Sequence, residues 1–217
     1  AINPFFIRRR KFRVAVDGCN GAGSVALPEL LKKLGCRVKA INCDTRLPFP
    51  HPPEPTAENL TELRELMRVE KFDIGFAMDS DADRLAVITD RGEAAGEELT
   101  LALAIKFVLG SGLPLRSKKK VAVVNLSTSR VIDDICREAG ALALRTKVGE
   151  VHVSEQIKEV KAPIGGEGNG GIVFPKVGYN RDSLSGAALI LNYMATSGKS
   201  VTELIAVGGL AERSPLL

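Results

Sequence analysis

The sequence has no tryptophan, and its 217 residues include only two tyrosines, two histidines and four cysteines. Basic residues outnumber acidic ones by 30 to 26 and cluster at 8–13 and 118–120. No basic run is interleaved with aromatic residues that could stack on bases. We therefore interpret these clusters as solvated flanks of strands and expect no nucleic-acid partner.

The four cysteines form no CxxC pair, and together with the scarcity of histidine this disfavours a zinc site. We expect reduced thiols. No apolar run approaches the ~18 residues that span a bilayer. The opening segment AINPFFIRRRKF lacks the uninterrupted apolar region of a signal peptide. These absences predict a soluble, unsecreted and cytoplasmic protein with no membrane partner.

Two segments of the chain share one pattern of predicted elements. Residues 11–44 (KFRVAVDGCNGAGSVALPELLKKLGCRVKAINCD) predict a strand, a Gly-rich turn, a helix ended by glycine and a second strand. Residues 118–149 repeat this plan with a Ser/Thr turn in place of the Gly-rich one. We therefore expect an α/β protein of two tandem, similar domains, 1–96 and 97–217, whose mixed, mostly parallel sheets are covered by helices.

The remaining elements follow from hydrophobic patterning. We expect a helix over 57–69 with Thr56 as its N-cap, and apolar or amphipathic helices over 97–109, 150–160 and 183–196. The segments FDIGFAM, LAVITD, APIG and IVFP predict strands, and GSGLP predicts a surface connection.

The strongest chemical signal is the loop DSDADR, which follows the buried strand FDIGFAM. Its acids, Asp79, Asp81 and Asp83, lie at alternate positions and repel one another. A hard cation would remove that repulsion, and a carboxylate set with open positions suits Mg²⁺. The spacing does not fit an EF-hand loop. Three solvated acids in a polar turn are the alternative.

A second signal is the glycine-rich segment 165–171. Its glycines allow close backbone approach, and Glu167 and Asn169 could bind neighbouring hydroxyl groups. A simple hairpin is the alternative. Three basic residues near predicted strand ends or turns, Arg145, Lys147 and Arg181, could bind phosphate.

A third signal competes with these two. Gly21-Ala22-Gly23 with Ala26 fits the loose pattern G-x-G-x-x-A, and Asp44 ends the next strand where a ribose-binding acid would stand. An NAD-dependent oxidoreductase is therefore an alternative. Pro28 early in the helix favours a structural strand-to-helix bend instead.

Taken together, VDGCNGAGS, DSDADR and GGEGNGG followed by Arg181-Asp182 resemble the motifs of the α-D-phosphohexomutases, the family of phosphomannomutases, phosphoglucomutases and phosphoglucosamine mutases. The match runs from about residue 11 to residue 205 and corresponds to the middle two of that family's four domains. The resemblance implies a metal loop and a sugar-recognition loop. It also implies that the phosphoserine loop and the distal phosphate-binding loop belong to N- and C-terminal domains absent from this chain.

The resemblance also implies roles for individual residues. The metal ligands would be Asp79, Asp81 and Asp83; the catalytic residues Arg84 and Lys147; the substrate contacts Glu167, Asn169 and Arg181. The family's glycines between the aspartates are Ser80 and Ala82 here, and Gly171 replaces the histidine that some members carry.

The activity implied is interconversion of hexose 1- and 6-phosphates through a phosphoserine and a bisphosphate intermediate, with Mg²⁺ as cofactor. We expect the 217-residue chain alone to be inactive. A catalytically silent binding protein of mutase fold is a further alternative. The sequence leaves open which hexose phosphate is the substrate.

Overall fold

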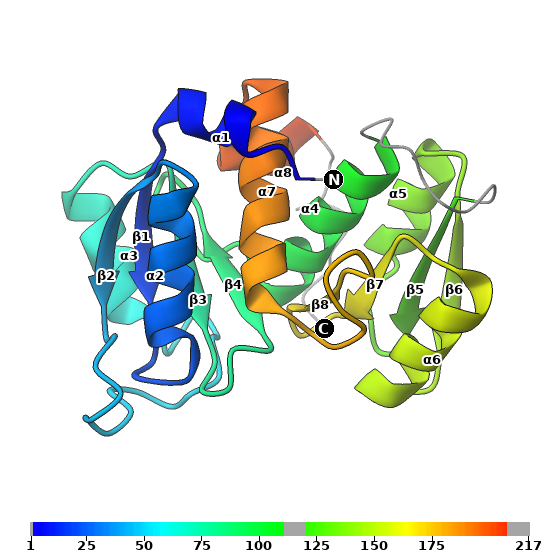
Figure 1. Cartoon of the computed structure of the whole chain (residues 1–217), viewed down its shortest axis with the longest axis horizontal. Coiled ribbons are helices and arrows are strands. Elements are labelled where there is room, and N and C mark those ends of the chain that lie inside the picture. The colour runs from blue at the N-terminus through cyan, green and yellow to red at the C-terminus, as the bar shows by residue number, and fades with distance from the viewer. Residues whose placement is uncertain (1, 111–119, 208–217) are drawn as a thin grey trace.

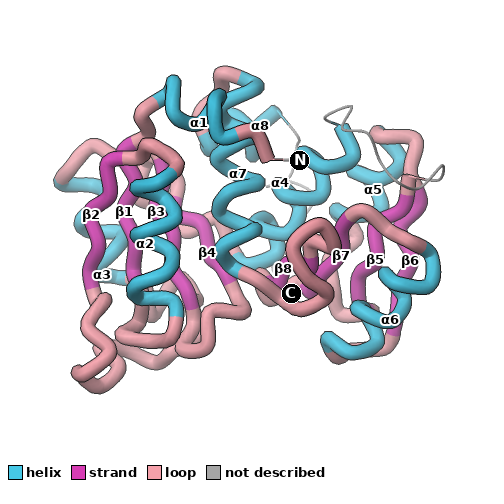
Figure 2. Tube along the Cα trace, in the orientation of Figure 1, coloured by secondary structure: helices cyan, strands magenta, loops and turns pink. Residues whose placement is uncertain are grey.

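The computed structural model describes residues 2–110 and 120–207. It contains two four-stranded sheets with the same strand order, β2-β1-β3-β4 and β6-β5-β7-β8 (Figures 1 and 2). The first sheet consists of β1 (Arg13–Asp17), β2 (Arg37–Ile41), β3 (Ile74–Met78) and β4 (Leu85–Ile88). The second consists of β5 (Val121–Asn125), β6 (Leu142–Thr146), β7 (Ile164–Glu167) and β8 (Gly171–Val173).

Strand direction repeats between the two sheets as well. In each sheet three strands run parallel, and the fourth pairs antiparallel with the third through a short connection. The central strands β1, β3 and β5 are apolar and almost wholly buried, as expected for sheets covered on both faces. This confirms the predicted α/β class with two similar units and mixed, mostly parallel sheets.

Eight helices lie within the described residues. They are α1 (Pro4–Arg10), α2 (Gly23–Lys33), α3 (Thr61–Val69), α4 (Glu97–Gly110), α5 (Val131–Glu138), α6 (Glu150–Val160), α7 (Ser183–Ser197) and α8 (Val201–Val207). The helices expected over 97–109, 150–160 and 183–196 correspond to α4, α6 and α7 within one residue at either end.

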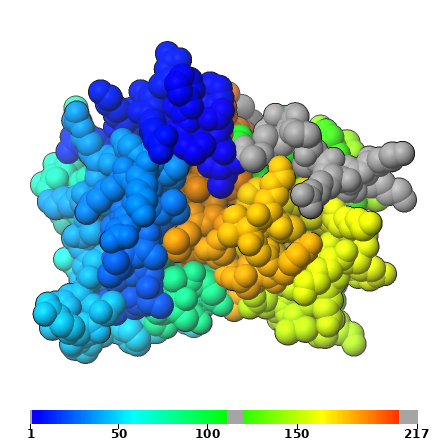
Figure 3. Space-filling model, viewed as in Figure 1, coloured from blue at the N-terminus to red at the C-terminus, as the bar shows by residue number. Residues whose placement is uncertain are grey.

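The helices α4 and α7 lie between the two sheets (Figure 1). Both are buried on nearly all sides, in agreement with their apolar composition. One hydrophobic cluster runs from the first sheet through α4 and α7 to the second. The space-filling view shows the blue N-terminal segment against the orange atoms of α7 (Figure 3). The two units therefore share a core, and the boundary at residues 96 and 97 stays a prediction.

Some expectations were wrong in detail. Residues 57–60 form turns, and α3 begins only at Thr61 after Leu60, which offers no side-chain cap. Thr56 is not the N-cap, because the Asn59 side chain donates to the Glu54 carbonyl and holds a turn there (2.9 Å). The helices α1 and α8 were not anticipated. The connection GSGLP lies, apart from Gly110, outside the described residues.

Within those residues, none of the helices has the length and apolarity that crossing a bilayer demands. The four cysteines are free thiols. Burial, assisted by nearby carboxylates, raises the pKa of Cys19 to about 11, of Cys36 to about 12 and of Cys136 to about 11.

We predict that these thiols resist modification in the native protein, because the reactive thiolate is scarce and shielded from solvent. At pH 8, titration with Ellman's reagent should detect at most one fast-reacting thiol, the half-buried Cys43, and four after addition of urea. Rapid reaction of two or more thiols in the folded protein would contradict this.

Candidate functional site

The loop DSDADR (residues 79–84), called the aspartate loop below, lies at the carboxyl edge of the first sheet. Strands β1 and β3 run parallel, so the turn after Asp17 and the loop after Met78 meet at this edge. The amide of Ala22 donates to the carbonyl of Ser80 (2.8 Å). A side chain at Gly21 would lie 2.4 Å from that same carbonyl oxygen, so glycine is required for this close approach.

This packing decides the role of the Gly21-Ala22-Gly23 turn. Ser80 and Met78 occupy the space beside its glycines, and little room is left for a pyrophosphate. Asp44, the candidate ribose ligand, pairs with Arg46 instead (2.8 and 2.9 Å). The turn packs against the aspartate loop and supports it, which argues against the dinucleotide-binding alternative.

Asp79 is buried and organises the loop. Its Oδ1 accepts from the amides of Asp83 (3.1 Å) and Arg84 (3.0 Å), and its Oδ2 accepts from Arg84 Nε (2.7 Å). Burial works to raise the pKa of Asp79, but these hydrogen bonds outweigh burial and hold the pKa below its usual value. Asp79 therefore remains ionised at neutral pH.

The other two acids lie beside Asp79. One ligand oxygen from each of Asp79, Asp81 and Asp83 falls within 4.8 Å of the others. Oxygens bound to one Mg²⁺ lie about 3–4 Å apart, since each is about 2.1 Å from the ion. Small side-chain rotations would bring the three acids onto one cation, so the set could hold a metal ion.

Asp83 shows the electrostatic cost of this crowding. Burial, together with the hydrogen bond and charge of Asp79, raises the pKa of Asp83 to about 6. The charge of Arg181 opposes the rise. Arg84 and Arg181 are the cations that offset the three carboxylates in the described structure.

Arg181 joins the aspartate loop to the second sheet. Its guanidinium forms ion pairs with Asp83, with Glu167 (3.0 Å) and with Glu150 (3.4 Å). The next two residues continue this connection. Asp182 caps α7 by accepting from the amide of Leu184 (3.0 Å), and the amide of Ser183 donates to the Ala82 carbonyl (3.3 Å). The start of α7 is thus attached directly to the aspartate loop.

The glycine-rich segment forms a tight hairpin between β7 and β8. Gly165, Gly166 and Glu167 belong to β7, and Glu167 is only 5% exposed. Its Oε1 accepts from Asn125 Nδ2 (2.7 Å) and from the amide of Gly149 (3.0 Å). Strand β7 continues two residues beyond the predicted segment APIG because Gly166 and Glu167 pair with β8. A Cβ at Gly166 would be 2.2 Å from the Gly171 carbonyl, so this pairing requires glycine.

The aspartate loop and this hairpin occupy equivalent positions, each linking the third and fourth strands of its sheet. They touch, because the Leu85 amide donates to the Gly170 carbonyl (3.2 Å). The structure therefore brings together the three aspartates, Arg84, Arg181, Glu167 and, on the hairpin itself, Asn169. The Oδ1 atom of Asn169 accepts from the Gly171 amide in the same turn (3.2 Å).

The other two basic candidates differ from each other. Lys147 is exposed and follows β6 at the carboxyl edge of the second sheet, beside His152 in a hollow of about 250 Å³. Arg145 is structural. Its guanidinium donates to the carbonyl of Thr128 (2.7 Å) and to Asp133 (2.6 Å), so these donors are not available to a phosphate.

Supporting residues were missed by sequence reasoning. Asn125, Gly149 and Glu150 fix Glu167 and Arg181 but belong to no recognisable motif. The proline-rich segment carries two more. Its His51 contacts the buried carboxylate of Asp17 (3.3 Å), and its Glu54 lies 3.9 Å from Arg84. Only the concentration of prolines between 48 and 55 hinted that this segment was ordered.

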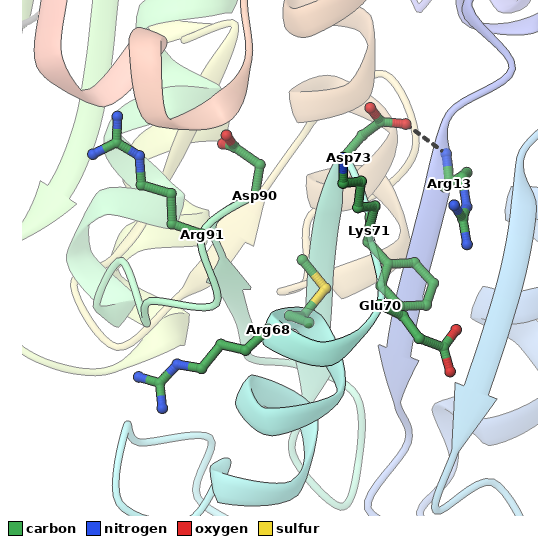
Figure 4. Close-up of a pocket in the computed structure, with 9 residues that line it drawn as sticks. Arg13, Arg68, Glu70, Lys71, Asp73, Asp90 and Arg91 are labelled. Atoms are coloured by element: carbon green, nitrogen blue, oxygen red, sulfur yellow. Dashed lines mark hydrogen bonds between the residues drawn. The ribbon is translucent and has the colours of Figure 1, made fainter.

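A larger hollow, of about 480 Å³, lies at the opposite edge of the first sheet (Figure 4). Its acids already have partners, because Asp73 accepts from the Arg13 amide (2.7 Å) and Asp90 accepts from Thr202. The Arg68 and Arg91 side chains point away from its centre (Figure 4). The aspartate loop, where the charged groups converge, is therefore the stronger candidate for the functional site.

Comparison with known families agrees with this geometry. Residues 2–92 match the family described as phosphoglucomutase/phosphomannomutase, alpha/beta/alpha domain II, and residues 96–208 match domain III of the same family. The chain belongs to the phosphoglucomutase/phosphomannomutase family, the α-D-phosphohexomutases, and contains its two middle domains. The resemblance found in the sequence is confirmed.

Individual relatives are named as mutases. A phosphoglucomutase/phosphomannomutase of Thermococcus kodakarensis is 40% identical over 92% of this chain and 43% of its own length. A protein of Methanopyrus kandleri named probable phosphoglucosamine mutase is 38% identical over 89% of this chain and 42% of its own length. The chain thus spans less than half the length of these two relatives.

Solved structures share the fold. A phosphoglucomutase/phosphomannomutase family protein from Burkholderia thailandensis has a TM-score of 0.80 at 26% identity, over 94% of this chain and 45% of that one. N-acetylphosphoglucosamine mutase of Aspergillus fumigatus, in complex with GlcNAc-6P and magnesium, has a TM-score of 0.67 at 20% identity, over 94% of this chain and 51% of that one.

Ala82 stands where the family resemblance implies glycine, and this difference should affect the stability of the protein. Ala82 adopts φ +62°, in the left-handed region that glycine tolerates better than alanine. We predict that Ala82→Gly raises the free energy of unfolding by about 0.5–1 kcal/mol, since relief of backbone strain exceeds the entropy cost of glycine. Urea denaturation would measure it. The control Ala95→Gly, at a residue outside that region, should lower stability. A lower stability for Ala82→Gly would contradict the argument.

Proposed function

We propose that this chain is the metal- and sugar-binding core of a phosphohexomutase that interconverts hexose 1- and 6-phosphates. The observation that carries the proposal is the convergence of Asp79, Asp81 and Asp83 beside the hairpin that holds Glu167. Phosphoryl transfer depends mainly on positioning and charge neutralisation, which are the two functions that this arrangement can provide.

Mg²⁺ is the proposed cofactor, held by the three aspartates. The donor set supports this, because it consists of carboxylate oxygens with no histidine or cysteine among them. When bound, the ion would neutralise charge on the phosphoryl group being transferred. Arg84 lies beside Asp79 with its guanidinium partly exposed, so we assign it to the phosphate next to the metal loop.

The sugar would meet the second unit. We assign hydroxyl recognition to the hairpin with Glu167 and Asn169, of which Asn169 is the more accessible. Lys147 stands at the same carboxyl edge and would bring a positive charge to the substrate. Direct contact of Arg181 with phosphate would require its ion pairs with Asp83 or Glu167 to open.

The rest of the reaction is assigned to the whole protein. We propose that a phosphoserine and a second phosphate-binding loop are supplied by domains outside these 217 residues, so this polypeptide alone should show no mutase turnover. Relatives named for glucose, mannose and glucosamine phosphates leave the choice of hexose open.

Calorimetric titration with Mg²⁺ tests the metal site. We predict one site of micromolar or weaker affinity, and loss of most binding in Asp81→Asn. Asp81 suits the test because it is exposed and none of the hydrogen bonds or ion pairs found among the described residues involves it. Its replacement should therefore leave the loop folded.

The matched control is Asp44→Asn, which removes an acid on the same side of the first sheet without touching the loop. That variant should bind Mg²⁺ as the unmodified chain does. Unchanged affinity in Asp81→Asn would refute the assignment of the loop as a metal site.

A further inference from the structure

We propose that Arg181 is a positioning residue that couples the aspartate loop to the glycine-rich hairpin by orienting Asp83 and Glu167 together. The inference rests on the proposed metal site and adds a residue that acts through two others. It also assigns Arg181 a role different from the substrate contact implied by the family resemblance.

Arg181 forms ion pairs with carboxylates of both units. The guanidinium lies between Asp83 of the first unit and Glu150 and Glu167 of the second. Its side chain is only 18% exposed, so these ion pairs are weakly screened. A planar fork of five donors can serve several carboxylates at once, which an ammonium group does less well.

The backbone also fixes Arg181 in place. Its amide donates to Glu150 Oε1 (2.8 Å), and it forms a bridge with Val173 of β8. The amide of Asp182 donates to the Ile172 carbonyl (2.9 Å). The guanidinium therefore projects toward the aspartate loop from a backbone segment that is hydrogen-bonded to β8 and to Glu150.

Arg181 hydrogen-bonds only one of the two carboxylate oxygens of Asp83. Arg181 engages Oδ2, whereas Oδ1 lies 3.9 Å from Arg84 Nε, beyond hydrogen-bond distance, and could turn to a cation shared with Asp79 and Asp81. Groups that hold a metal ligand in orientation commonly change metal affinity about 10–100-fold when they are mutated. Without Arg181, the Asp83 and Glu167 carboxylates would also lose the cation between them.

The coupling has a defined route. Arg181 donates to Glu167 Oε2 (3.0 Å), while Glu167 Oε1 accepts from Asn125 and from the Gly149 amide. A shift of Asp83 on metal binding would therefore reach Gly149 through Arg181 and Glu167. The direct contact from Leu85 to Gly170 bypasses Arg181 and provides an internal comparison.

An NMR titration with Mg²⁺ alone, recorded on the 217-residue chain, tests this route. In the unmodified chain the Gly149 and Gly170 amides should both shift with the saturation curve of the 79–84 amides. In Arg181→Gln, Mg²⁺ affinity should fall about 10–100-fold. At saturating Mg²⁺, Gly170 should still shift in that variant while Gly149 stays still.

Two further variants separate this role from a general structural one. Arg145→Gln removes another partly buried arginine of the second unit, one that contacts neither Asp83 nor Glu167. Because it does donate to the carbonyl of Asn125 (3.3 Å), it serves as a control for Mg²⁺ affinity, which should be unchanged. Arg181→Lys keeps the charge without the fork. It should restore part of the affinity but not the Gly149 response, and it carries the test if Arg181→Gln does not fold.

The titration of the unmodified chain tests the metal site, and its comparison with Arg181→Gln tests the coupling role of Arg181. If the unmodified chain shows no saturable Mg²⁺ binding, the proposed metal site fails, and the coupling built on it fails too. If it binds Mg²⁺, but Arg181→Gln binds within twofold of it and Gly149 still shifts, the metal site stands and the coupling role of Arg181 is overturned.

Discussion

Repulsion among carboxylates gathered at one place is the constraint on which this site depends. Asp79, Asp81 and Asp83 share a short loop, and two glutamates approach from the second unit, Glu167 in β7 and Glu150 at the start of α6. Such groups are costly to bury unless cations or hydrogen bonds compensate. Arg84 and Arg181 provide part of that compensation, and the negative charge that remains is why the loop could hold a divalent ion.

The fold makes this gathering possible by repeating one unit twice. In each unit the third and fourth strands are joined at the carboxyl edge, which yields the aspartate loop in one and the glycine hairpin in the other. The buried helices α4 and α7 then hold the two sheets against one core. Because α7 starts beside the aspartate loop, packing of the core also fixes the distance between the two edges.

Much of the architecture could be predicted from periodicity and glycine placement. The strand IGFAM and the helix over 150–160 follow directly from their apolar patterns. Helix α1 was not predicted, although Asn3 followed by Pro4 is a typical helix start, because seven residues are too few to show a helical hydrophobic period. Its Ile7 is buried through a tertiary contact that a short segment does not reveal.

The site was predicted only in part, for a physical reason. The aspartates are close in sequence, and their repulsion is legible from spacing alone. Arg181 lies 98 positions from Asp83, and nothing local to either residue predicts that they meet. The burial of Glu167 likewise depends on Asn125 and Gly149, which only the folded second sheet brings near it.

An anomalous difference map from a crystal soaked in Mn²⁺, a cation that also prefers carboxylate oxygen ligands, would show whether the aspartate loop binds a divalent ion. We expect one strong peak coordinated by Asp79, Asp81 and Asp83, with Arg181 still hydrogen-bonded to Oδ2 of Asp83. A peak elsewhere would refute the metal site, and a peak at the loop with Asp83 turned away from it would refute the role given to Arg181.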